Sequence, residues 1–108
     1  MTNQALGEFE HLVLLAIVRE GERAHGAAIR RCLEERAGRG ASFGAIYSTL
    51  RRLEAKGWIV SERRQAAHDA GERDRKYVRL TPAGREALAA TGERLRRMAE
   101  GLDMALGS

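Results

Sequence analysis

The chain has 108 residues, of which 44% are hydrophobic and 31% charged, and its formal net charge is +4. This size and composition predict one folded domain and exclude a disordered chain. The longest apolar run covers residues 12–18, which is shorter than the roughly 20 residues of a bilayer span. The single cysteine, the absence of a secretory signal and the spacing of the histidines predict a cytoplasmic protein without metal or cofactor.

The positive charge is concentrated in the middle of the chain. Residues 39–80 contain ten Lys/Arg and five Asp/Glu, a net charge of +5, whereas residues 1–38 carry −1 and residues 81–108 carry zero. A concentration of this kind favours a polyanionic partner, and nucleic acid is the leading candidate.

Two helices are predicted before this basic segment. Apolar residues recur at helical spacing over residues 6–19, which predicts a core helix that ends at Gly21. A second helix is predicted over residues 25–36, with Cys32 on its inner stripe. The two glycines of residues 38–40 break that helix and predict a short turn.

A third helix is predicted between Ser42, a good N-cap residue, and Gly57, a stop signal. Its apolar face follows the 3.6-residue period and contains Phe43, Ile46, Tyr47, Leu50 and Leu53. The opposite face carries small residues followed by arginine, namely Gly44, Ala45, Ser48 and Arg52, with Arg51 at its edge. No acidic residue occurs from Ser42 through Leu53.

This third helix has the composition of a helix that enters the major groove of DNA. Small side chains let its backbone approach the bases, and the N–H groups of its first turn can donate to phosphate. Arg51 and Arg52 follow one turn later, where they can reach phosphate or the O6 and N7 atoms of guanine. The alternative is a surface helix with solvated arginines, which does not explain why acidic residues are missing.

A β-hairpin is predicted next, from a strand that begins at Trp58 and a second strand over residues 76–80. The polar segment between the strands predicts a loop longer than the tight two-residue type. Basic residues surround this loop, and they are Arg63, Arg64, His68, Arg73, Arg75 and Lys76. A basic wing of this kind would follow phosphates or reach into the minor groove, although Asp69, Glu72 and Asp74 dilute its charge.

The last predicted helix begins at Thr81 and Pro82 and runs towards Leu106. Leucines recur along it at a spacing of seven, which is a weak heptad pattern. This stripe packs either on its own domain or on the same helix of a second copy. We favour the second interpretation, because the first three helices and the hairpin already supply a core. The predicted dimer contacts are Leu88, Leu95, Met98, Leu102 and Leu106.

The predicted fold is mainly α with a small β-hairpin. It is a winged helix-turn-helix over residues 5–80 followed by a dimerisation helix over residues 81–106, in one compact unit. The predicted DNA-contacting residues are Ser42, Gly44, Ala45, Tyr47, Ser48, Arg51, Arg52, Arg63, Arg64, Arg73 and Lys76.

The chain resembles the PadR family of bacterial transcriptional regulators, in particular its short members with a single C-terminal helix. The resemblance covers roughly residues 5–90. It rests on residues 6–10 and 12–17, on His25-Gly26 with Ile29, on residues 44–54 and 56–57, on Arg75-Lys76-Tyr77 and on residues 80–85. The last of these segments reads LTPAGR, and its first five residues also occur in other winged-helix families such as MarR.

The resemblance implies a homodimer that binds an inverted-repeat operator and usually represses transcription. It also implies that Tyr47 lies near the DNA backbone and that the C-terminal helix mediates dimerisation. Two positions depart from the family. His25 stands where an aromatic residue is usual. Some short relatives bind flat aromatic drugs between tryptophans at the dimer interface. Trp58 is the only tryptophan here and is expected in the core, so that drug site is not expected in this chain.

The sequence gives less support to other functions. Ser42 and Ser48 have no recognisable base partner and no phosphate-cradling glycine loop is present, so no enzyme activity is expected. The alternatives to a PadR-type repressor are a winged-helix module that binds a protein and a MarR-like regulator. A small apolar effector at the Leu88/Leu95/Leu102 interface would change the spacing of the two reading helices.

Overall fold

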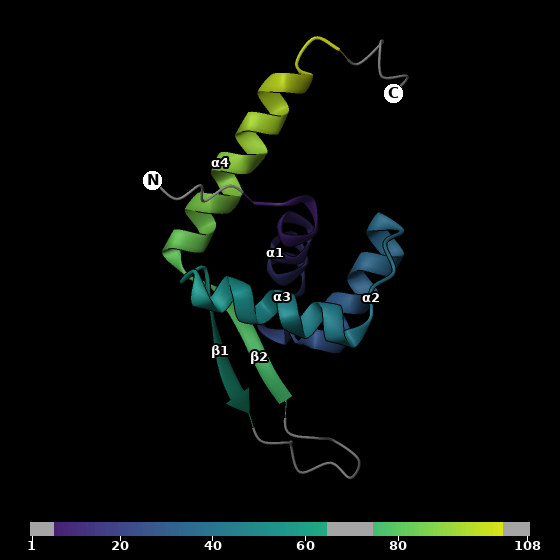
Figure 1. Ribbon diagram of the computed structural model, residues 1–108, viewed down its shortest axis with the longest axis vertical. Helices are drawn as coiled ribbons and strands as arrows, with labels where there is room; N and C mark the ends of the chain where they lie inside the picture. The colour runs from purple at the N-terminus through teal and green to yellow at the C-terminus, as the bar shows by residue number, and fades with distance from the viewer. Residues whose placement is uncertain (1–5, 65–74, 103–108) are drawn as a thin grey trace.

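The computed structural model describes residues 6–64 and 75–102, and it confirms a mainly helical chain with one antiparallel hairpin. Figure 1 shows the order of the elements, with α3 lying across α1, the hairpin beside α3, and α4 extending away from the body. The elements are α1 (Glu8–Glu20), the short turn η1 (Gly21–Arg23), α2 (Gly26–Ala37), α3 (Phe43–Ala55), β1 (Ile59–Arg64), β2 (Arg75–Leu80) and α4 (Pro82–Ala99).

The helix α1 is the centre of the core, as its dense apolar pattern predicts. It buries Val13, Leu14, Ala16 and Ile17, because it packs against α2, α3, β2 and α4 at once. The helix begins at Glu8, two residues later than predicted, because the Gly7 N–H is held by the Glu10 carboxylate at 3.2 Å. This contact satisfies one of the donors that a helix start leaves unpaired.

The prediction that Ser42 caps α3 is confirmed, since its Oγ accepts from the Ala45 N–H at 3.0 Å. The predicted apolar face is partly wrong. Ile46, Leu50 and Leu53 are buried, but Phe43 and Tyr47 are 43% and 44% exposed. The buried stripe is centred on Ile46 and Leu53 and continues to the other side at Thr49, which is 2% exposed, so the two aromatic residues lie at its edge.

The hairpin pairs Ile59 with Leu80 at its base and Arg64 with Arg75 at its far end. Its inner face buries Ile59, Val78 and Leu80, and Trp58 just before it is buried as predicted. A single bridge between His25 and Tyr77 adds the connection after η1 to the free edge of β2. The wing is therefore joined to the helical core at both of its strands.

The prediction that α4 runs to Leu106 is wrong, because the helix ends at Ala99. Glu100 has an extended backbone and Gly101 follows with φ of 81°, so the helical hydrogen bonding stops there. Leu102 therefore lies beyond the helix, and Leu106 lies outside the described residues. None of the described helices has both the length and the apolar content needed to cross a bilayer.

Candidate nucleic-acid interface

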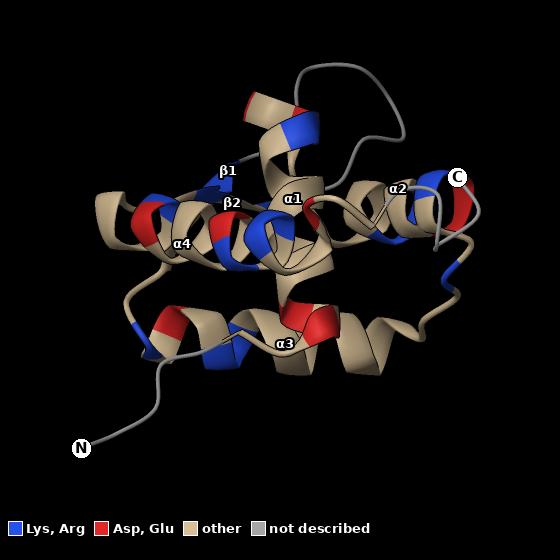
Figure 2. Cartoon of the chain, turned by 90° about the horizontal axis from the view of Figure 1, so that it is seen from above, with Lys and Arg blue, Asp and Glu red and all other residues tan. Residues whose placement is uncertain are grey.

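The exposed face of α3 combines small side chains with basic ones. Gly44 and Ala45 are exposed in its first turn and Ser48 is half-buried, so this face of the helix is thin at its leading end. Arg51 follows on the same exposed surface and makes no side-chain hydrogen bond or ion pair within the described residues. The leading half of α3 carries no charged residue, and its acidic residue, Glu54, lies near its far end; Figure 2 draws the leading end of α3 in plain tan. This surface can approach a polyanion without meeting a carboxylate first.

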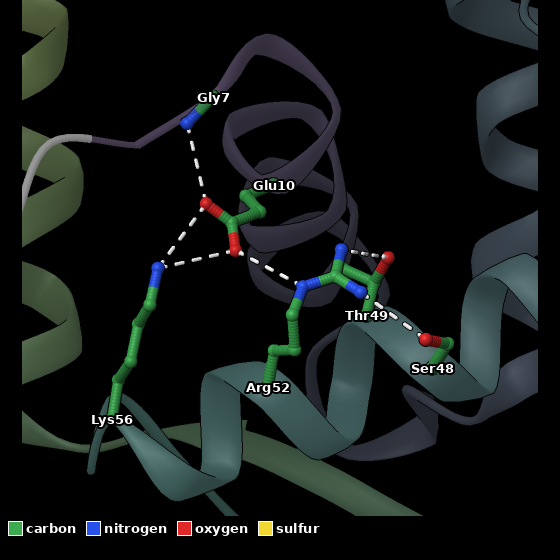
Figure 3. Close-up of polar contacts among 6 residues, drawn as sticks. All are labelled: Gly7, Glu10, Ser48, Thr49, Arg52 and Lys56. Atoms are coloured by element: carbon green, nitrogen blue, oxygen red, sulfur yellow. Dashed lines mark hydrogen bonds and ion pairs between the residues drawn. The ribbon is translucent and has the colours of Figure 1, made fainter.

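Arg52 is held differently from Arg51 (Figure 3). Its guanidinium donates to Ser48 Oγ and Thr49 Oγ1, both at 3.1 Å, and its Nε lies 3.7 Å from Glu10 Oε2. The side chain is still about half exposed, at 53%. Arg52 is therefore tied along the helix, and about half of its side chain is left in water.

Glu10 is the centre of this network and was missed by the sequence analysis. It is buried on α1, and Lys56 from the end of α3 donates to its two carboxylate oxygens at 3.4 and 3.2 Å. Burial alone would raise the pKa of Glu10, but the hydrogen bonds from Gly7 and Lys56 and the charges of Lys56 and Arg52 lower that pKa overall. The ionised carboxylate thus clamps the trailing half of α3 onto α1.

Tyr47 is held at the leading half of α3 by packing. An added Cβ at Gly26, the first residue of α2, would lie 2.6 Å from the Tyr47 hydroxyl, so only glycine allows the ring to approach this closely. The Tyr47 ring also stacks on Phe43, with ring centroids 6.2 Å apart. Gly26 of the His25-Gly26 pair therefore leaves the space that the Tyr47 ring occupies.

The wing arginines do not all face outward. Arg64 turns back to donate to the Glu22 carbonyl at 2.9 Å, and its guanidinium lies 4.2 Å from the centre of the Tyr77 ring. Arg63 and Lys76 form an exposed cross-strand pair, and Lys76 lines a groove with Tyr47, Arg51 and the acidic Glu54 of α3. The predicted contact Arg73, like His68, lies outside the described residues.

His25 fixes the base of the wing. Its Nε2 lies 3.1 Å from Arg75 Nη1 and its Nδ1 lies 2.8 Å from the Arg23 carbonyl oxygen. A guanidinium only donates, so Nε2 accepts from Arg75 and Nδ1 carries the proton that it donates to Arg23. His25 also meets the Tyr77 ring edge-on at 5.4 Å. This residue therefore links the start of α2 to β2.

The fold and this basic surface define a winged helix-turn-helix protein. The model of the transcriptional regulator PadR-like family matches residues 14–90, and the chain belongs to that family. Within the part of the chain that the structure describes, no group of His, Cys, Asp or Glu side chains could hold a metal ion.

The chain is similar to several known regulators. It is 43% identical over 75 residues to the transcriptional regulator Rv3488 of Mycobacterium tuberculosis, a match that covers 69% of this chain and 65% of that relative. The chain therefore spans less than two thirds of that relative's length. Among solved structures, a PadR family transcription regulator from Clostridium difficile has a TM-score of 0.76 at 25% identity, covering 94% of this chain and 100% of the other. Bacillus subtilis PadR in complex with operator DNA shares the fold, with a TM-score of 0.62 at 24% identity, covering 76% of this chain and 45% of the other.

Proposed function

We propose that two copies of this chain bind an inverted-repeat operator in double-stranded DNA and repress transcription from it. In this proposal α3 of each copy lies in the major groove, and the hairpin follows neighbouring phosphates or the minor groove. The observation that carries the proposal is the exposed face of α3, where Gly44 and Ala45 leave the backbone open and Arg51 is exposed. Phosphate contacts by such a surface make binding strongly dependent on salt.

The proposed contact residues have different roles. Arg51 contacts a base edge or a phosphate. Arg52 and Arg64 donate to phosphate with those guanidinium N–H groups that make no hydrogen bond within the chain. Arg63 and Lys76 extend the basic surface along the wing. The full proposed set is Ser42, Gly44, Ala45, Tyr47, Ser48, Arg51, Arg52, Arg63, Arg64, Arg73 and Lys76.

The proposed dimer forms through α4, with contacts from Leu88, Leu95, Met98, Leu102 and Leu106. Leu95 and Met98 are 57% and 78% exposed on the part of α4 that projects from the body (Figure 1), which supports a partner there. Leu88 is half-buried against the core of its own chain, so its share of the interface is smaller. Two copies joined in this way would present their α3 helices to half-sites about 34–36 Å apart.

Sedimentation tests the dimer. The double substitution Leu95→Glu with Met98→Glu should give monomers at concentrations where the wild type is dimeric, because it places two charges in the apolar contact. Arg97→Gln, on the same exposed stretch of α4, is the matched control and should leave the dimer intact. A wild-type chain that sediments as a monomer at all concentrations would contradict this part of the proposal.

A mobility-shift titration tests operator binding. DNA from the chain's own promoter region and a random duplex of equal length are compared at about 50 and about 200 mM salt. The promoter DNA should bind more tightly, and Arg51→Ala should weaken that binding by about 1–3 kcal/mol if Arg51 reads a base. Arg97→Ala should leave it unchanged. Equal affinity for both duplexes would contradict specific repression, and a protein partner insensitive to salt and to Arg51→Ala would favour the interaction-module alternative.

Release of the operator by a small apolar effector at the α4 interface stays a prediction. A melting-temperature screen of the dimer against lipophilic compounds tests it, because a ligand that binds the folded dimer raises the transition temperature. A compound that raises this temperature and also weakens operator binding is the expected result, and a screen without shifts would speak against an effector of this class.

A further inference from the structure

We propose that Phe43 contacts the 5-methyl group of a thymine in the operator and so contributes to sequence preference. This inference rests on the proposed function, because it assigns a specific base contact to the helix that is proposed to enter the major groove. The helical period alone places Phe43 on the apolar face of α3, with no sign that its ring is exposed.

The first argument is where Phe43 lies. It is the first residue of α3, directly after the N-cap Ser42, and its neighbours Gly44 and Ala45 are the small exposed residues of the same turn. The ring is 43% exposed, whereas the next large apolar residue of the helix, Ile46, is fully buried. A large apolar ring left partly in water at the leading end of a reading helix gains from any apolar surface that covers it.

The second argument is that the ring is held in place before any partner arrives. It stacks on Tyr47 at an interplanar angle of 21°, and the Arg30 guanidinium lies 4.7 Å from its centroid. Arg30 is itself fixed, since its Nε donates to the Ala41 carbonyl at 2.8 Å. A side chain that is already ordered loses little conformational entropy when it makes a contact.

The third argument is the chemistry of the base edges. A phenyl ring has no hydrogen-bond donor or acceptor, so it cannot read the polar atoms of a base. Among the four bases only thymine presents a methyl group in the major groove, and apolar side chains contact it there. A second copy of the chain is a poorer occupant for the ring, because the exposed residues Leu95 and Met98 lie on α4, which points away from the leading end of α3 (Figure 1).

The test begins with selection of bound sequences from a random duplex library by the wild-type chain. Each thymine of the selected half-site is then replaced by deoxyuridine, which removes only the 5-methyl group. At one position the wild type should bind about fourfold more weakly, and about 15-fold more weakly when both half-sites are changed, as expected for one buried methyl per half-site. Phe43→Ala should bind the thymine and deoxyuridine duplexes equally.

Val18→Ala is the matched control, because Val18 is an exposed apolar residue of α1 outside the reading helix. This variant should keep the full deoxyuridine effect. The inference is overturned if the selected half-site lacks thymine, if no deoxyuridine duplex binds the wild type more weakly, or if Phe43→Ala keeps the effect. A library that yields no enriched sequence would overturn the proposed specific DNA binding itself, and the two failures are therefore distinguishable.

Discussion

The two halves of α3 are held to the rest of the chain by different kinds of interaction. Beside the buried Ile46, the leading half is seated on α2 by its aromatic residues, with Tyr47 against Gly26 and Phe43 under the Arg30 guanidinium. The trailing half is held by charge, with Arg52 and Lys56 drawn onto the buried carboxylate of Glu10. The half proposed to meet the bases therefore stays free of ion pairs, while the other half fixes the angle of the helix.

Substituting Glu10→Ala breaks the charged half and is expected to have a larger effect than breaking the packed half. Lys56 and Arg52 lose their common acceptor and the Gly7 N–H is left without its partner, so we expect a loss of about 2–3 kcal/mol in the free energy of unfolding. Urea unfolding measures it. Glu93→Ala, which removes an exposed partner of Arg96 on α4, is the control and should change nothing measurable. Equal losses for the two variants would mean that Glu10 does not clamp α3.

The packed half is broken at Gly26. Gly26→Ala should cost about 1–2 kcal/mol of folding stability, because the new methyl group forces the Tyr47 ring to move. A double-mutant cycle with Tyr47→Ala isolates this contact, since the cost should disappear once the ring is gone. If Gly26→Ala costs the same in both backgrounds, the glycine is needed for some reason other than the tyrosine.

Acid should weaken the charged half before the packed half. The pKa of the folded Glu10 carboxyl lies below its ordinary value of 4.5, so the stability it contributes is complete above that pH and is lost as the pH falls below it. Burial lowers the pKa of the neighbouring His11 below 6.5, because it disfavours the charged imidazolium. Folding stability is therefore also lost as the pH falls through the range below 6.5, at a higher pH than the loss that Glu10 causes.

Unfolding by urea from neutral pH downward separates these two groups. His11→Gln should remove the part of the loss that begins below pH 6.5, and Glu10→Gln should flatten the part below pH 4.5. A stability that rises as the pH falls through either range would contradict the assignment for that residue.

The smallest expected effect on stability is that of Phe43→Ala. The ring is partly exposed and makes one stacked contact and one cation–π contact, so its loss should cost about 1 kcal/mol or less. Ile46→Ala, one turn further along the same helix and fully buried, should cost about 2–5 kcal/mol. Thermal and urea unfolding of the pair would show whether Phe43 is a surface residue in energetic terms or part of the core.

Most of the fold follows from local signals in the sequence. Ser42 and Thr81 cap their helices as predicted, because capping depends on atoms within one turn, and both side chains accept an N–H three residues later. The burial of Val78 and Leu80 likewise follows from the alternating pattern of the second strand. These predictions needed no knowledge of which elements pack together.

The parts of the candidate site that were missed depend on contacts between distant residues. Lys56 and Glu10 meet across 46 positions, and no local pattern identifies a carboxylate on α1 as the partner of the last turn of α3. Helical periodicity predicts which face of α3 is apolar, but it does not predict how far along the helix the core extends. It therefore groups Phe43 with the buried residues of that face. The early end of α4 has a local cause in Gly101, but apolar spacing was given more weight there than the cost of the glycine.

The start of α4 packs closely against the base of the wing. An added Cβ at Gly84 would come within 2.0 Å of the Trp58 carbonyl oxygen, and the Thr81 hydroxyl donates to the Gly57 carbonyl at 2.6 Å. These close contacts leave no room for the start of α4 to move separately from the hairpin. A tilt of α4 would therefore also tilt the β-strands. In any assembly that forms through α4, the position of this helix would then set the distance between the two wings.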